Sequence, residues 1–168
     1  MPRNSIDRVT DSTMRTTEGH LIIRDERIAI IAARFNESIV EHLISGAVDA
    51  LKRHGADDTQ LHLIRVPGAY ELPLAAQRLA KTRQVDGIVA LGVVIRGATP
   101  HFDYVCGECA SGLSRVSLEF DLPIGFGVLT CDTIEQAVER AGTKAGNKGI
   151  DAAMATIEMI GVIHQLGE

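Results

Sequence analysis

The feature that most constrains the fold of this chain is a regular alternation of short apolar segments with longer amphipathic ones. The apolar segments have the length of buried strands, and the segments between them carry apolar residues at intervals of three and four. The predicted strands are residues 27–35, 61–67, 86–97 and 123–131, and the predicted helices are residues 36–55, 71–84, 105–120, 132–142 and 150–161. This order indicates repeated strand–helix units.

Strands that are apolar almost throughout, rather than on alternate residues, are typical of a parallel sheet covered by helices on both faces. We therefore expect an α/β fold, a three-layer α/β/α sandwich with a four-stranded parallel sheet of flavodoxin-like topology. A chain of 168 residues is long enough for one such core. We expect residues 1–20 to form a flexible N-terminal arm and residues 21–168 a single domain.

Charge and hydropathy argue against several classes of function. The formal net charge of −5 speaks against nucleic acid as a partner, because proteins that bind nucleic acid usually present a basic surface. The sequence has no apolar run long enough to cross a bilayer, so we expect no membrane partner. The first twenty residues lack the apolar core of a signal peptide, and Asp7, Asp11 and Glu18 argue against a transit peptide. We expect a cytoplasmic protein.

Capping residues predict where two of the helices begin. Asn36 or Ser38 can cap the first helix. Thr133 and Gln136 form a possible capping box for the fourth helix.

The carboxyl ends of parallel strands lie at one edge of the sheet, and ligands bind there. The loops expected at that edge are residues 34–37, 66–71, 95–103 and 127–133. Together they supply an aromatic ring (Phe35), an amide (Asn36), a carboxylate (Glu71) and an imidazole (His101). This set suits a polar ring system, because the aromatic side chain can stack on the ring while the polar groups and the backbone beside Val94 bind its edge.

The loop before the third predicted helix carries further candidates. Its Gly97–Thr99 turn offers backbone N–H groups and a hydroxyl to an anion such as phosphate, although many such turns bind nothing. Arg140, expected within a helix, could supply a counter-charge or could be an ordinary surface arginine. His101 could be a structural histidine, but its position at the strand-end edge favours proton transfer.

The pair Cys106 and Cys109 leaves two interpretations open. The two thiols could form a redox dithiol or half a zinc site, with only Cys131 and His101 nearby in sequence as further ligands. The interpretation that we favour is two small apolar residues on one face of a helix. The sequence has no nucleophile elbow, dinucleotide-binding loop, Walker loop or metal-ligand cluster. What remains is a reaction that needs proton transfer and positioning.

Six ordered motifs from about Arg27 onward resemble the lumazine synthase family. They are ARFNESI, VPGAYELPLAA, ALGVVIRGATPHFDYV, FGVLT, EQAVERAGTKAGNKG and ATIEMIG. Their consistent order and separation over almost the whole chain make the resemblance far more specific than any single motif. The chain departs from the family pattern at Pro100, Gly107 and Cys109, which lie close to His101.

The resemblance implies a transferase, a 6,7-dimethyl-8-ribityllumazine synthase. Such an enzyme condenses 5-amino-6-(D-ribitylamino)uracil with 3,4-dihydroxy-2-butanone 4-phosphate and releases phosphate and water, in the penultimate step of riboflavin biosynthesis. It needs no cofactor and no metal. The alternative is a noncatalytic relative that binds flavins or lumazines or acts as a scaffold, against which the intact Phe35, His101 and Arg140 argue. A thiol oxidoreductase that uses Cys106 and Cys109 is a third hypothesis.

The resemblance also implies a role for individual residues. His101 is the general acid and base, and Ala98, Thr99 and Arg140 bind phosphate. The residues that bind substrate are Phe35, Asn36, Ala69, Tyr70, Glu71, Val93, Val94, Ile95, Phe126 and Lys148.

The resemblance implies an oligomer as well. In the family the pocket lies between neighbouring subunits of a pentamer, and the neighbour supplies the residues that match Phe126, Arg140 and Lys148. We therefore expect a homopentamer. A 60-subunit icosahedral shell that encloses riboflavin synthase is the larger assembly formed by some members, and the compact connection at residues 142–149 is similar to theirs.

Overall fold

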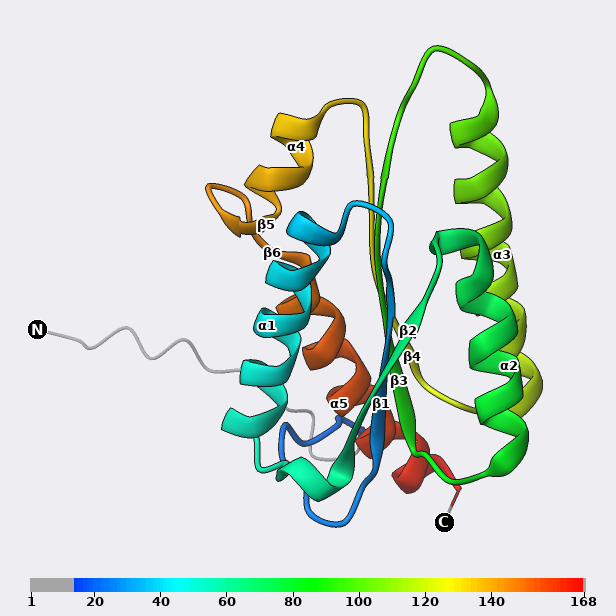
Figure 1. The fold of residues 1–168 in the computed structure, drawn as a ribbon. Coiled ribbons are helices and arrows are strands. Elements are labelled where there is room, and N and C mark those ends of the chain that lie inside the picture. The colour runs from blue at the N-terminus through cyan, green and yellow to red at the C-terminus, as the bar shows by residue number, and fades with distance from the viewer. Residues whose placement is uncertain (1–13, 168) are drawn as a thin grey trace, which may run out of the picture.

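The computed structural model describes residues 14–167, which form three layers (Figure 1). The central sheet contains the parallel strands β1 (Ile28–Ala33), β2 (Leu61–Val66), β3 (Gly87–Ile95) and β4 (Ile124–Cys131). They lie in the order β2-β1-β3-β4. Flavodoxin-like sheets begin with this order, so the predicted four-stranded α/β sandwich is confirmed.

Helices cover both faces of the sheet. On one face lie α1 (Glu37–Arg53), α4 (Ile134–Glu139) and α5 (Lys148–Leu166), and on the other lie α2 (Leu72–Thr82) and α3 (His101–Phe120) (Figure 1). Single turns of 3-10 helix, η1 (Asp58–Gln60) and η2 (Ala69–Glu71), precede β2 and α2. Each predicted helix is therefore present, with its ends shifted by a few residues.

The core has two apolar layers because successive side chains of a strand point to opposite faces of the sheet. In β1, Ile28 and Ile30 pack against α1 and α5, whereas Ala29 and Ile31 belong to the layer beneath α2 and α3. All four side chains are at most 1% exposed. This burial on both faces explains why the strand is apolar throughout.

The segment between α4 and α5 contains a small antiparallel hairpin that the sequence reasoning missed, formed by β5 (Ala141–Thr143) and β6 (Gly146–Asn147). Asn147 then caps α5, since its Oδ1 accepts a hydrogen bond from the N–H of Gly149 at 2.8 Å. Its Nδ2 donates to the carbonyl oxygen of His42 on α1 at 3.0 Å. The hairpin is thereby joined to α1.

The predicted N-terminal arm is only partly within the described residues. Residues 14–20 lie in no helix or strand. Gln165 Nε2 donates to the carbonyl oxygen of Glu18 at 2.6 Å, and a Cβ at Gly19 would lie 1.9 Å from the carbonyl oxygen of Glu158. The described end of the arm therefore packs on α5. The prediction for residues 1–13 concerns a stretch outside the described residues.

Candidate active site

A cleft of about 530 Å³ lies at the carboxyl ends of β1 and β3. These strands are neighbours in the sheet, but the chain leaves β1 for α1 on one face and leaves β3 for α3 on the other. The two connections diverge and leave a crevice between them. Doubly wound sheets bind their ligands at this kind of switch point.

Most of the predicted site residues meet in this cleft, although they come from three separate loops. The predicted residues that line it are Phe35, Asn36, Ala69, Tyr70, Glu71, Val93, Val94, Ile95, Thr99 and His101. Ala98 is not among the lining residues. Its neighbours Gly97 and Thr99 are, so the turn that the sequence proposes for phosphate borders the cleft.

The loop after β1 presents an aromatic ring and fixes an amide. Phe35 is 72% exposed, and its backbone N–H donates to the carbonyl oxygen of Pro67 at 3.0 Å. Asn36 has a left-handed backbone (φ 59), which asparagine tolerates better than most residues. It stands at the N-cap position of α1 but makes no side-chain cap, so the predicted capping role is wrong. Its Nδ2 donates instead to the carbonyl oxygen of Val93 at 2.8 Å.

β3 extends beyond the end of β1 at the floor of the cleft. The pairing of β3 with β1 ends at Leu91, whereas its pairing with β4 continues to Ile95. On the side of β1, the backbone beyond Leu91 therefore faces the cleft without a strand partner. Asn36 binds the Val93 carbonyl on this free edge. The next backbone groups that face the same side are those of Ile95, because successive residues alternate and Arg96 faces β4.

The loop after β2 forms the second wall of the cleft. It folds into η2, where the N–H of Glu71 donates to the carbonyl oxygen of Gly68 at 3.3 Å. The Glu71 carboxylate lies close to Gly68: a Cβ added at Gly68 would be 3.3 Å from Oε2 of Glu71. Tyr70 is 60% exposed. The 3-10 turn thus presents a phenol and a carboxylate at the edge of the cleft.

The third wall is the first turn of α3, and here the sequence prediction is corrected. We expected His101 in a loop and the helix from 105, but α3 begins at His101. The helix brings Phe102, Tyr104 and Val105 into the cleft beside His101. Sequence reasoning missed these three and also Gly68. Pro100 and the acidic Asp103, both typical of a helix start, were the signals for the earlier beginning.

Charged side chains lie beside this first turn. Arg96 forms ion pairs with Asp103 and Asp132. The hydrogen bond that Arg96 donates to Asp132, more than the neighbouring charge of Asp103, raises the pKa of the Arg96 guanidinium. Arg96 is therefore a permanent cation next to the cleft.

Besides Ala98, three predicted site residues do not line the cleft and lie elsewhere in the fold. Phe126 on β4 is 40% exposed and borders a hollow of about 350 Å³ beneath α3. Arg140 and Lys148 line a third hollow, of about 280 Å³, with Cys131 and Asp151. The part of the fold described here thus separates these three side chains from the cleft.

Arg140 also occupies a different local position from the one predicted. Because α4 ends at Glu139, Arg140 is the residue that follows the helix and not a residue within it. Its Nη1 donates to the carbonyl oxygen of Gln136 at 2.9 Å and lies 3.7 Å from the Glu139 carboxylate. Its side chain is 45% exposed, so the remaining guanidinium N–H groups can reach a ligand.

Comparison with protein families shows to which family the chain belongs. A family model described as 6,7-dimethyl-8-ribityllumazine synthase matches residues 25–164. The chain belongs to this family. It is a transferase of riboflavin biosynthesis that forms 6,7-dimethyl-8-ribityllumazine. Lumazine synthases act on small-molecule substrates and oligomerise. Within residues 14–167, none of the helices has the length and hydropathy that crossing a bilayer requires.

The cysteine pair does not resemble a reactive dithiol within this lumazine synthase fold. Cys106 and Cys109 lie on α3, and both are free thiols. Cys109 is fully buried, and burial raises its pKa to about 12. Burial also raises the pKa of Cys106. Neither thiol is a thiolate near neutrality, and residues 14–167 contain no group of three His, Cys, Asp or Glu side chains able to hold a metal ion.

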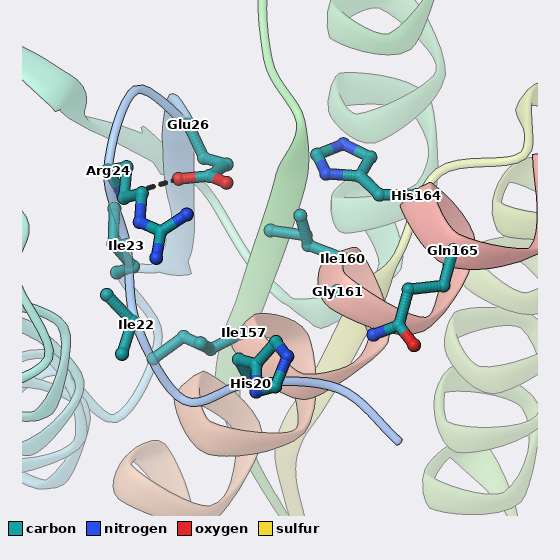
Figure 2. Close-up of a pocket in the computed structure, with 10 residues that line it drawn as sticks. All are labelled: His20, Ile22, Ile23, Arg24, Glu26, Ile157, Ile160, Gly161, His164 and Gln165. Carbon is teal, nitrogen blue, oxygen red and sulfur yellow. Dashed lines mark hydrogen bonds between the residues drawn. The ribbon is translucent and has the colours of Figure 1, made fainter. Parts of the chain in front are cut away.

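A further hollow, of about 160 Å³, lies between residues 20–26 and α5 (Figure 2). His20, Arg24 and Glu26 approach His164 and Gln165 there, over an apolar floor. None of the predicted site residues lines it. It borders the amino end of β1, whereas the cleft lined by Phe35 and His101 borders the carboxyl end.

Proposed function

We propose that the cleft at the carboxyl ends of β1 and β3 binds both substrates of the lumazine synthase reaction and that His101 transfers protons within it. The observation that carries this proposal is the meeting of three loops, distant in sequence, at the switch point of the sheet. Each loop brings one of the chemical groups that the condensation needs.

The pyrimidine has a suitable place between Phe35 and the free edge of β3. The exposed Phe35 ring can stack on the pyrimidine, and backbone groups of Ile95 can bind its polar edge. Ala69, Tyr70 and Glu71 are placed to bind the ribityl chain, whose hydroxyl groups both donate and accept hydrogen bonds. Asn36 holds the Val93 carbonyl and so orients this edge.

His101 lines the same cleft as Thr99, which precedes it by two residues, so a ketone whose phosphate binds at Thr99 would lie close to the imidazole. The amine of the pyrimidine condenses with the ketone to an imine and releases one water, phosphate is then eliminated, and the ring closes with loss of a second water. Each step moves a proton, and imidazole exchanges protons readily near neutrality. A positioned acid and base of this kind contributes about a hundredfold to ten-thousandfold, and proximity of the two substrates supplies much of the rest.

We also propose that Ala98, Thr99 and a neighbour's Arg140 bind the phosphate, and that the neighbour supplies Phe126 and Lys148. Within one chain Arg140, Phe126 and Lys148 lie apart from the cleft, which supports their supply by a neighbouring subunit. A homopentamer is the assembly proposed, in the cytoplasm. The larger proposal is a 60-subunit shell around riboflavin synthase, which the short β5–β6 connection suits.

The test mixes the purified protein with the two proposed substrates and follows lumazine fluorescence. We expect product from the unmodified protein, a raised KM for the pyrimidine in Phe35→Ala, and a kcat lowered about a hundredfold or more in His101→Ala. His42→Ala is the matched control, because His42 lies on α1 and its Nδ1 pairs with the Ser38 carbonyl of its own helix at 2.8 Å. Ligand binding without product would favour the noncatalytic alternative.

A further inference from the structure

Arg96 makes contacts that the proposed chemistry does not use. Its Nε donates to Asp132 Oδ1 at 2.9 Å, and its Nη1 donates to Asp103 Oδ1 at 3.4 Å. The guanidinium carbon also lies 4.4 Å from the centroid of the Phe102 ring. One side chain therefore joins the end of β3, the first turn of α3 and the loop after β4.

The β4 side of this junction is fixed by its own hydrogen bonds. The backbone N–H of Arg96 donates to the carbonyl oxygen of Cys131 at 2.8 Å. The N–H of Asp132 donates to Gln136 Oε1 at 2.7 Å, and the N–H of Gln136 donates to Thr133 Oγ1 at 3.1 Å. The predicted Thr133 cap therefore forms, with the reciprocal bond one residue earlier than in a capping box. Asp132 is a firm anchor for the guanidinium.

The α3 side of the junction is held less firmly by its own residues. Pro100 stands at the N-cap position and makes no side-chain cap for the helix. The next residues are His101, Phe102 and Asp103, and Arg96 contacts the last two of them. Because the three share one helical turn, the position of the His101 side chain follows that of its neighbours.

We propose that Arg96 is a positioning residue, which holds the first turn of α3 against the β4 loop and thereby places His101 in the cleft. This inference rests on the proton-transfer role proposed for His101. A general acid or base must stay within hydrogen-bond reach of the proton that it moves. A displacement of about 1 Å can lower a rate about a hundredfold.

The test is a double-mutant cycle between Arg96→Gln and His101→Ala, with kcat and both KM values measured by lumazine fluorescence. In the otherwise unmodified protein, Arg96→Gln lowers kcat about tenfold to a hundredfold and leaves both KM values within about twofold. In the His101→Ala background it changes kcat by less than about twofold, because the group that it positions is gone. Arg96→Lys restores part of kcat, since a lysine can pair with one carboxylate but lacks the guanidinium fork.

Two further variants separate this role from a general effect on folding. Asp132→Asn weakens the hydrogen bond that Arg96 donates to Asp132 and leaves the residues that line the cleft unchanged. It lowers kcat as Arg96→Gln does, by a smaller factor. Arg53→Gln, which removes an exposed arginine paired with Asp49 on α1 at 2.8 Å, leaves kcat unchanged. Melting temperature and elution volume show that each variant folds and assembles.

Equal losses in both backgrounds would overturn the inference, as would a raised KM with unchanged kcat, which indicates direct contact with substrate. If Arg96→Gln is fully active while His101→Ala is not, the inference about Arg96 fails alone. If His101→Ala keeps full activity, the role proposed for His101 fails, and the inference fails with it.

Discussion

The two groups of predicted site residues lie in different parts of the fold. The group around Phe35 and His101 is assembled by the chain itself, from three loops that meet at one switch point. The group of Phe126, Arg140 and Lys148 is divided between two other hollows on β4 and the segments after it. The first group forms a cleft, and the second forms no site with it in a single chain.

If both groups serve one site, as proposed above, one chain carries two incomplete and dissimilar surfaces. Such surfaces can complete each other only in a head-to-tail contact, in which one copy offers the cleft and the next offers the arginine. A ring of copies closes that contact. Two predictions test this division directly, and two more test the packing of β4 and the cysteine pair, beginning with the largest effect.

Mixed assemblies of two impaired variants should regain activity when the phosphorylated ketone is kept below the raised KM of Arg140→Ala. His101→Ala damages the cleft and Arg140→Ala damages the remote group, so a site between one copy of each can have both halves intact. With random mixing during co-expression, about a quarter of the sites are intact, against almost none in either variant alone. Lumazine fluorescence of the co-purified protein measures this recovery. Mixed protein no more active than its parents would place both residues in one chain's site.

Arg140→Ala by itself should affect one substrate far more than the other. Charge-assisted hydrogen bonds to an anion are worth about 1.5–3 kcal/mol. The KM for the phosphorylated ketone should therefore rise about tenfold to a hundredfold, while the KM for the pyrimidine stays within about twofold. Steady-state kinetics with each substrate varied in turn measures the two values. Equal changes in both would count against the phosphate role.

Gly125→Ala should destabilise the β4 side of the fold. A Cβ there would lie 2.2 Å from the carbonyl oxygen of Ala152 and 2.4 Å from Thr156 Oγ1, so α5 must move away. Overpacking of this kind costs about 1–3 kcal/mol. The melting temperature at fixed protein concentration measures the loss. Gly107→Ala on α3 is the control, since its Cβ meets nothing within 4 Å and alanine favours a helix.

The smallest effect is expected from removal of the cysteine pair. Because burial raises the pKa of Cys106 and Cys109, both stay protonated at neutral pH, and thiolate forms only in alkaline solution. The double variant Cys106→Ala, Cys109→Ala should keep its kcat within about twofold. Activity that disappears in this variant would revive the oxidoreductase hypothesis.

The sequence is most informative where burial imposes a pattern. The continuous apolar run of β1 predicted a strand covered on both faces, and the order of strands and helices predicted the strand-end site. The start of α3 was placed four residues late, because regular apolar spacing begins at Val105, while no residue of the first turn is fully buried and two of them, His101 and Asp103, are polar. That error hid Phe102 and Tyr104.

Two other features lie beyond what local patterns show. The β5–β6 hairpin is too short to carry a periodic signal, and its contact through Asn147 with α1 joins residues 105 positions apart. The bond from Asn36 to the Val93 carbonyl is equally nonlocal, so asparagine at a helix start was interpreted as a cap. Local propensity predicts which hydrogen bonds an asparagine side chain can make to its own segment, and tertiary contacts decide whether it makes those or a nonlocal one.

Because the cleft and the hollow of Arg140 are separate within one chain, the activity of the enzyme should depend on its concentration. If each working site spans a contact between copies, turnover per subunit depends on association and falls when the protein is diluted below the dissociation constant of the ring. An excess of substrate, which bridges the two surfaces, would then hold the ring together and slow that decline.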